Sequence, residues 1–169
     1  MIVRRATDAD ATAIAKIHVD AWRAAYGGIV PASFLDSLSI EAREKVWRGN
    51  LERRDSETWV AEDRDEIVGW LSAGASRDAG ALPSTGEVWG LYVAPAHWRR
   101  GVGRRLCSDT EGYLVAAGFS DMTLWVLKKN VPAIAFYQSI GMAIEPTIEK
   151  TSTRTGAELV EVRLRKRLV

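Results

Sequence analysis

The chain has 169 residues, of which 47% are hydrophobic, and these values fit a single domain over residues 1–169 with a core of its own. Its 23 basic and 22 acidic residues give a formal net charge of +1, which predicts neither a nucleic-acid partner nor a membrane surface. The single cysteine, Cys107, excludes an internal disulfide, and two histidines are too few for a zinc site, so no metal is expected. Because the chain has neither a membrane-length apolar run nor a signal-peptide core, we expect a cytoplasmic protein.

Apolar periodicity predicts alternating strands and helices in the N-terminal half. In chain order these are a strand over Ile2–Arg5, a helix through Ile14 to Ala25, a short helix after Pro31, a helix over Ile40–Leu51, and a strand pair over Glu57–Glu62 and Ile67–Ala75. The stretch from Gly74 to Gly86 is rich in glycine and serine and is expected to be a flexible loop.

The same alternation continues in the C-terminal half. It predicts a central strand from Glu87 that ends before Pro95, a helix from about Gly103 to Gly118, a strand over Met122–Leu127, a helix over Val131–Ile140, and a hairpin of Ala143–Thr151 with Leu159–Leu168. Taken together, the elements indicate an α/β fold, with a mixed sheet that carries helices on both faces.

A turn rich in arginine and glycine joins the central strand to the next helix. Gly101 and Gly103 allow the backbone to curve closely around a ligand, and the helix directs free N–H groups and its positive dipole end into the same space. Neighbouring positive charge comes from Arg99, Arg100, Arg104 and Arg105. This combination favours a ligand with several phosphates, although a solvated basic turn is the alternative. It fits neither the dinucleotide fingerprint nor the P-loop.

The segment Trp98-Arg99-Arg100-Gly101-Val102-Gly103 resembles the acetyl-CoA loop of the GCN5-related N-acetyltransferase (GNAT) superfamily, written Gln/Arg-x-x-Gly-x-Gly/Ala. Trp98 departs from the first position of that pattern. The segment from Asn130 to Met142 is similar to the family's second signature, Asn-x-x-Ala-x-x-Phe/Leu-Tyr-x-x-x-Gly-Phe. Because the two segments stand in the family's order and spacing, the resemblance covers nearly the whole chain. It implies the GNAT fold and acetyl-CoA as cosubstrate.

The resemblance also implies roles for individual residues. In the family, N–H groups of the loop hold the pyrophosphate, and the amides of a splayed central strand hold the pantetheine arm. Cofactor contacts are therefore expected at Leu91, Tyr92, Val93, Arg99, Arg100, Gly101, Val102, Gly103, Arg104, Asn130 and Tyr137. By the same resemblance, the N–H of Val93 is the oxyanion donor, Tyr137 is the general acid, and Glu87, fourteen residues before Gly101, is the general base. Structural alternatives are a solvent-facing carboxylate for Glu87 and a packed aromatic ring for Tyr137.

The family places the acceptor between the first helices and the central strand. Trp22, Tyr26 and Trp89 are therefore expected to bind it, with core packing as the alternative. The segment from His18 to Pro31 resembles a motif of many bacterial members but gives no acceptor identity. The expected function is acetyl transfer from acetyl-CoA to a primary amine of a small molecule, with CoA as product. Alternatives are a protein N-terminal or lysine acetyltransferase and a non-catalytic acetyl-CoA-binding sensor. Family members often pair through the C-terminal hairpin, which makes a homodimer an expectation of the resemblance.

Overall fold

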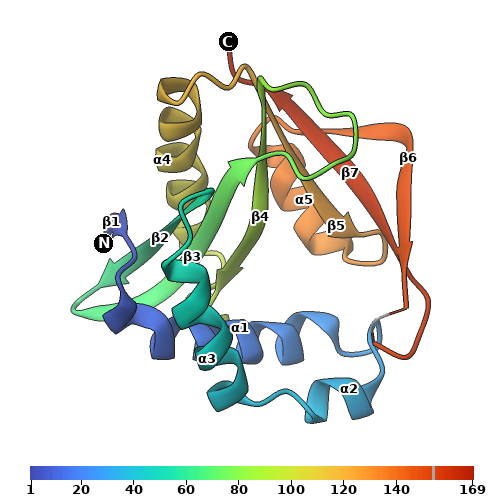
Figure 1. Cartoon of the computed structure of the whole chain (residues 1–169). Helices are drawn as coiled ribbons and strands as arrows, with labels where there is room; N and C mark the ends of the chain where they lie inside the picture. The colour runs from blue at the N-terminus through green and yellow to red at the C-terminus, as the bar shows by residue number, and fades with distance from the viewer. Residues whose placement is uncertain (154) are drawn as a thin grey trace.

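The computed structural model describes residues 1–153 and 155–169, and it contains the alternating helices and strands that the sequence predicts (Figure 1). Its strands are β1 (Ile2–Arg5), β2 (Ser56–Asp63), β3 (Glu66–Ala75), β4 (Thr85–Val93), β5 (Asp121–Leu127), β6 (Ala143–Ser152) and β7 (Leu159–Arg167). Its α-helices are α1 (Ala11–Tyr26), α2 (Ala32–Asp36), α3 (Ile40–Leu51), α4 (Val102–Ala116) and α5 (Val131–Ser139). Short 3₁₀ turns lie at Asp8–Asp10 and Pro95–His97.

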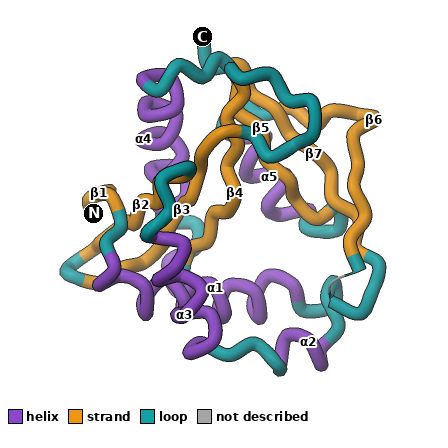
Figure 2. The backbone as a smooth tube through the Cα atoms, in the orientation of Figure 1, coloured by secondary structure: helices purple, strands orange, loops and turns teal. Residues whose placement is uncertain are grey.

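Within the described residues, the strands form one seven-stranded sheet in the order β1-β2-β3-β4-β5-β7-β6. The β4–β5 pair is parallel and the other neighbouring strands are antiparallel. Helices α1 and α3 cover one face of this sheet, and α4 and α5 cover the other (Figure 2). The predicted α/β architecture, with a mixed sheet and helices on both faces, is confirmed.

The two faces of the sheet build separate apolar layers because strand side chains alternate in direction. In β2, Val60 packs with the layer under α1 and α3, whereas Ala61 packs with the layer under α4. Both residues have no exposed surface, which explains why the middle of β2 reads as an uninterrupted apolar run. Leu106 of α4 is also fully buried, and burial of one such side chain stabilises the fold by about 1.5–3 kcal/mol.

Local signals in the sequence account for several element ends. The Ser39 hydroxyl accepts the Ala42 N–H at 3.2 Å and caps α3. β4 begins at Thr85 rather than at Glu87, because Thr85 and Gly86 already pair with β5. No helix in the described part of the chain is long and apolar enough to cross a membrane.

Candidate active site

Strands β4 and β5 separate in the middle of the sheet. Their last pair is Val88 with Leu124, although β4 continues to Val93 and β5 to Leu127. We call the opening between these two strand ends the fork; the strands can be seen to diverge in Figure 1. On its other side β4 stays paired with β3 as far as Val93. The fork therefore exposes one edge of a strand that is otherwise held in place.

The free edge of β4 presents main-chain groups from alternate residues. The Ala94 N–H donates to the Val68 carbonyl of β3 at 2.9 Å. In an antiparallel pair the direction alternates, so Tyr92 also directs its main-chain groups at β3, while Leu91 and Val93 direct theirs into the fork. Buried main-chain groups need partners, and an extended ligand amide chain can supply them as an added strand does. Of the three predicted contacts, Tyr92 can therefore offer its side chain but not its main chain.

The predicted anion-binding turn forms at the end of the fork. Gly101 has φ 84° and precedes the first residue of α4, so the first N–H groups of the helix open onto the turn. Arg99 has φ 59°, a left-handed conformation that costs about 1–2 kcal/mol for a non-glycine residue. A Cβ on Gly103 would lie 3.2 Å from Cζ of Phe136, so this position has room for no more than a small side chain. The turn thus has the shape and polarity that a pyrophosphate requires.

The arginines of the turn divide into two groups. Arg104 donates to the Ser139 hydroxyl of α5 at 3.2 Å, and Arg105 donates to Asp109 at 3.0 Å. Arg99 and Arg100 are exposed and have no side-chain partner among the described residues. Arg99 and Arg100 therefore remain available to a phosphate, and Arg104, which contacts α5 through Nη2 alone, keeps its other donors free for one.

Trp98 has a structural role that its departure from the family pattern did not reveal. Its indole N–H donates to the Val93 carbonyl at 2.7 Å. This bond ties the turn to the end of β4 and occupies one of the two main-chain groups that Val93 directs into the fork. The Val93 N–H, the predicted oxyanion donor, remains available.

Helix α5 brings Tyr137 to the layer between α4 and the fork. The Asn130 side chain accepts the Ala133 N–H at 3.3 Å and caps the helix, so this predicted cofactor contact has a capping role in the structure. Tyr137 is 9% exposed, and burial raises the pKa of its hydroxyl. The phenol therefore carries its proton at neutral pH, as a general acid must.

Glu87 lies at the start of the fork, but its carboxylate has a partner that the sequence did not reveal. Arg77, from the loop between β3 and β4, donates to Glu87 Oε1 through Nε at 3.1 Å and through Nη2 at 2.5 Å. The Arg77 backbone N–H donates to Oε2 at 2.8 Å. Glu87 is 2% exposed, so the alternative of a solvent-facing carboxylate is wrong. Its role as general base stays a prediction.

The predicted acceptor residues fall into two places. Trp22 and Tyr26 of α1 meet edge to face at 4.9 Å, and the Tyr26 hydroxyl lies 3.4 Å from that of Tyr92. Trp89 makes no ring contact with this pair among the described residues, because its ring lies under the guanidinium of Arg77 at 4.5 Å. Burial raises the pKa of both Tyr26 and Tyr92, so both phenols are neutral.

His18 belongs to the same aromatic cluster and was not predicted as a site residue. It stacks on Tyr92 at 5.0 Å and on Trp70 at 5.6 Å. Burial and the nearby charge of Arg43 lower the pKa of His18 to about 3, and neither ring nitrogen has a partner in the described part of the chain. A lone histidine at helical spacing carried no signal that could distinguish it from core packing.

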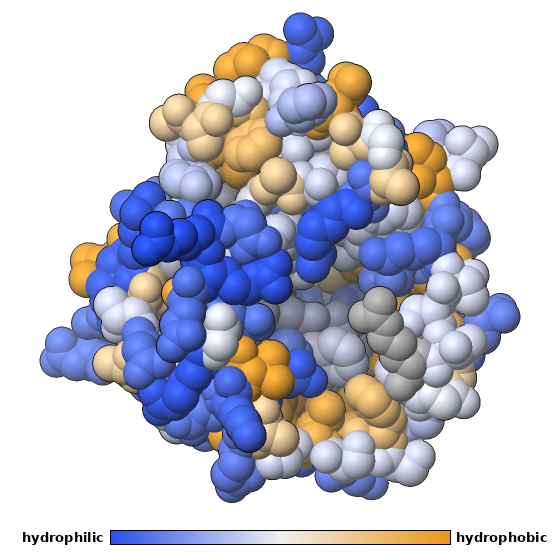
Figure 3. Space-filling model, viewed as in Figure 1, coloured by the Kyte–Doolittle hydropathy of each residue, from blue (hydrophilic) through white to orange (hydrophobic). Residues whose placement is uncertain are grey.

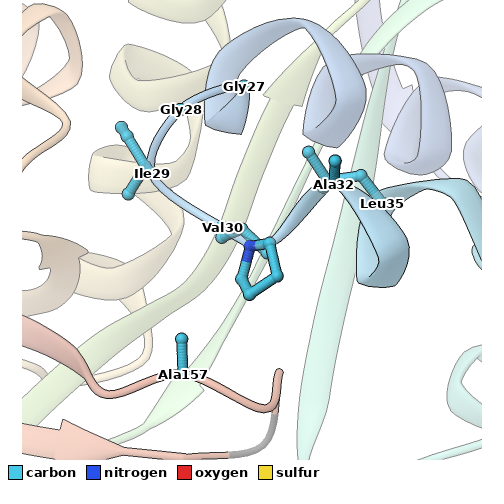
Figure 4. A pocket seen from close by; sticks show the side chains of 8 residues that line it. Gly27, Gly28, Ile29, Val30, Ala32, Leu35 and Ala157 are labelled. Carbon is cyan, nitrogen blue, oxygen red and sulfur yellow. The ribbon is translucent and has the colours of Figure 1, made fainter.

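A hollow opens between the end of α1 and the turn that joins β6 to β7. It has a volume of about 330 Å³ and is lined by Gly27, Gly28, Ile29, Val30, Pro31, Ala32, Leu35 and Ala157 (Figure 4). Val30 and Leu35 pack in one cluster with Tyr26, which connects this apolar hollow to the aromatic residues. Figure 3 shows the corresponding face, where hydrophilic residues lie above the central hollow and apolar residues lie below it.

Comparison with known proteins agrees with this geometry. The model of the "Acetyltransferase (GNAT) family" matches residues 13–142. The uncharacterized N-acetyltransferase YuaI of Bacillus subtilis is 34% identical over 163 residues, covering 96% of this chain and 90% of the relative. The L-amino acid N-acyltransferase MnaT of Escherichia coli is 24% identical over 157 residues, covering 92% and 87%.

Among solved structures, the PaiA N-acetyltransferase of Thermoplasma acidophilum in complex with coenzyme A superposes with a TM-score of 0.79. It is 18% identical, and the match covers 98% of both chains. The fork, the glycine turn and the start of α4 in the present chain fit a coenzyme A thioester. The chain therefore belongs to the GNAT acetyltransferase family, and it is an acetyl-CoA-dependent N-acetyltransferase.

Proposed function

We propose that this enzyme transfers the acetyl group of acetyl-CoA to the primary amine of a small molecule. The observation that carries the proposal is the fork, which connects the anion-binding turn on one side with the aromatic cluster and the apolar hollow on the other. A hollow of about 330 Å³ is the size of a small-molecule site. The relative MnaT, named as an acyltransferase of L-amino acids, supports a small acceptor.

In the proposed reaction the amine attacks the thioester directly. A carbon–nitrogen bond forms, the carbon–sulfur bond breaks, the amine loses a proton and the thiolate gains one. An acetylated cysteine is not part of the route, because Cys107 is 3% exposed and burial raises the pKa of its thiol to about 12. The thiol therefore stays protonated and is a poor nucleophile at neutral pH.

Three groups of the chain serve this transfer. The Val93 N–H donates to the oxyanion that develops on the acetyl group, and the neutral Tyr137 hydroxyl returns a proton to the sulfur. Glu87 takes the amine proton at Oε2, where the Arg77 backbone N–H leaves a lone pair unused. Because Glu87 is 2% exposed, the proton passes through one intervening water.

Thermal unfolding and a thiol-release assay test the proposal together. Acetyl-CoA and CoA at about 100 times their dissociation constants should each stabilise the protein by roughly 2.7 kcal/mol, while NAD and ATP should not. A panel of small primary amines should then release free CoA in the presence of the enzyme.

The two alternatives give different results in the same assay. Thiol release with unstructured peptides but with no small amine would indicate a protein acetyltransferase. Stabilisation by acetyl-CoA without thiol release from any amine or peptide would indicate a sensor domain. Either result would overturn the small-molecule proposal.

A further inference from the structure

The loop between β3 and β4 crosses the fork on the side of α1. We call residues 76–84 the strap; it is the arch in front of β5 and β7 in Figure 1. Arg77 holds it to β4 through Glu87. Asp78 holds the strap to β5 and β7. Its carboxylate accepts the indole N–H of Trp125 on β5 at 2.9 Å and a guanidinium N–H of Arg163 on β7 at 2.9 Å. Side chains thus hold the loop, which was expected to be flexible, to both β4 and β5.

Arg77 is fixed in orientation from two directions. Glu87 receives its Nε and Nη2 groups, and the flat ring of Trp89 lies 4.5 Å from the guanidinium carbon. Burying a carboxylate costs several kcal/mol of lost hydration, which an ion pair of this kind only partly returns. If this contact only held the strap to β4, an apolar pair at positions 77 and 87 would serve equally well. The arrangement points to a need for one arginine in one fixed position.

The outer edge of this arginine remains unused. A guanidinium is planar and has five N–H donors. Glu87 accepts hydrogen bonds along the edge that holds Nε. The opposite edge, with Nη1, makes no hydrogen bond or ion pair among the described residues, where Asp55 interacts with Arg77 only through longer-range charge, and the side chain is 55% exposed. A carboxylate fits such an edge with two parallel hydrogen bonds.

The other cations beside the strap are already engaged. Arg163 divides its donors between Asp78 and Glu145, and it is 18% exposed. Lys150 lies over the ring of Trp125 at 4.3 Å and 3.5 Å from Glu161. Arg77 is therefore the fixed cation near the start of the fork that still offers a free edge in the described part of the chain.

We propose that Arg77 binds a carboxylate of the acceptor and selects amines that carry one, such as amino acids. This inference rests on the proposed function and names the acceptor class of the same site. A monoanion is favoured over a phosphate dianion, because Glu87 already cancels one unit of charge beside the guanidinium.

Matched acceptor pairs test this proposal. L-Phenylalanine and L-methionine are compared with the amines that lack only the carboxylate, phenethylamine and 3-(methylthio)propylamine, at saturating acetyl-CoA. Wild-type enzyme should prefer the amino acids in kcat/KM. Arg77→Lys, which keeps a charge beside Glu87 but loses the planar edge, should lower that preference about tenfold, through KM. Values for the decarboxylated amines should fall less than those for the amino acids, because they share only the changed partner of Glu87 and lose no carboxylate contact.

Arg53 provides the matched control. It also lies over Trp89, at 5.5 Å, but its carboxylate partner Asp55 is 59% exposed and does not fix it as a buried group does. Arg53→Lys should leave both members of each acceptor pair unchanged. Circular dichroism and the acetyl-CoA-induced thermal shift show whether Arg77→Lys still folds and binds its cosubstrate.

Several results would overturn the proposal while leaving acetyl transfer intact. One is a higher wild-type kcat/KM for the decarboxylated amines than for the amino acids. The other is an equal fall in kcat/KM for both kinds of acceptor in Arg77→Lys. A binding readout separates the proposal from failure of the transferase function. CoA-loaded enzyme is titrated in a calorimeter with N-acetyl-L-phenylalanine and with N-acetylphenethylamine. Equal affinities for the two compounds would overturn the carboxylate site even if no acceptor were turned over.

Discussion

The two sides of the fork are built in different ways. Most of the cosubstrate side comes from one continuous stretch, in which the β4 edge leads through Trp98 and Gly101 into α4, and α5 adds Tyr137. The acceptor side is assembled from distant segments, since Arg77 meets Glu87 across the strap and Tyr26 of α1 meets Tyr92 of β4. A contiguous site is constrained by local backbone geometry, whereas an assembled site depends on long-range contacts that can vary while the fold is kept. The predictions below probe this difference, from the largest expected effect to the smallest.

Glu87→Gln should have the largest effect, because two proposed roles depend on this carboxylate, proton acceptance and the placement of Arg77. The variant removes the proton acceptor and weakens the hold on Arg77, so kcat/KM should fall about 1,000-fold, within the range of general-base removal. Thermal shift with acetyl-CoA is the control and should be unchanged. Wild-type turnover at pH 7 in the variant would exclude the base role.

Tyr137→Phe should reduce kcat about 100-fold while leaving acetyl-CoA affinity nearly unchanged. The phenol is neutral in the folded protein, because burial raises its pKa, and its loss removes the proton donor without changing the packing of the ring. Thiol release at saturating acetyl-CoA measures the effect. Ile134→Val is the control for packing on the same helix and should leave kcat unchanged. Unchanged turnover in Tyr137→Phe would assign Tyr137 to the core alone.

The sequence predicted the backbone of the cosubstrate side, a strand followed by a glycine turn and a helix, because its signals are local. Gly101 has a positive φ, and a Cβ on Gly103 would lie in tight contact with Phe136, so the glycine pattern reflects local constraints that the structure contains. The family resemblance predicted that the central strand splays from its neighbour. The pairing of β4 with β5, which stops at Val88 and Leu124, confirms this.

The acceptor side could not be predicted to the same depth. Arg77 is one of many charged loop residues, and its meaning comes only from a buried carboxylate on the next strand. His18 gave no local signal either, because its surroundings come from α3, β3 and β4. Sequence periodicity places a residue on a face, but it does not name the neighbours that the tertiary fold brings to that face.

Acid should destabilise the protein through His18. Its folded pKa of about 3 is below the unfolded value of 6.5, so the unfolded chain binds more protons between these values and stability is lost as the pH falls through this window. Between pH 6.5 and 4.5 the loss should be about 2 kcal/mol. Urea unfolding at the two pH values measures it, and His18→Leu should abolish most of this loss. His97→Gln is the control. If His18→Leu still lost the full unfolding free energy between the two pH values, His18 would not be the cause of the acid destabilisation.

Gly103→Val should weaken acetyl-CoA binding about tenfold, because a branched side chain built on a Cβ that already lies 3.2 Å from Phe136 narrows the turn, whereas the family pattern accepts only glycine or alanine here. Gly112 lies in the same helix, and a Cβ there would meet nothing within 4 Å. Gly112→Ala should therefore stabilise the protein by about 0.5–1 kcal/mol and leave binding unchanged. Thermal shift against acetyl-CoA concentration measures both variants. Equal acetyl-CoA affinities in the two variants would mean that the turn tolerates a side chain and does not bind the cosubstrate closely.

Trp98→Phe should have the smallest effect, and it tests how the turn is coupled to the fork. Phenylalanine keeps the ring but removes the N–H that bonds the Val93 carbonyl at 2.7 Å, so the free energy of unfolding should fall by about 1 kcal/mol. Trp98 is 42% exposed, and water can replace part of the lost bond, which keeps the cost low. If the bond also orients the Val93 N–H toward the oxyanion, kcat should fall severalfold while the acetyl-CoA-induced thermal shift stays the same. A loss of stability with wild-type kcat would limit Trp98 to holding the turn, and the oxyanion donor would then be positioned by the β3–β4 pairing alone.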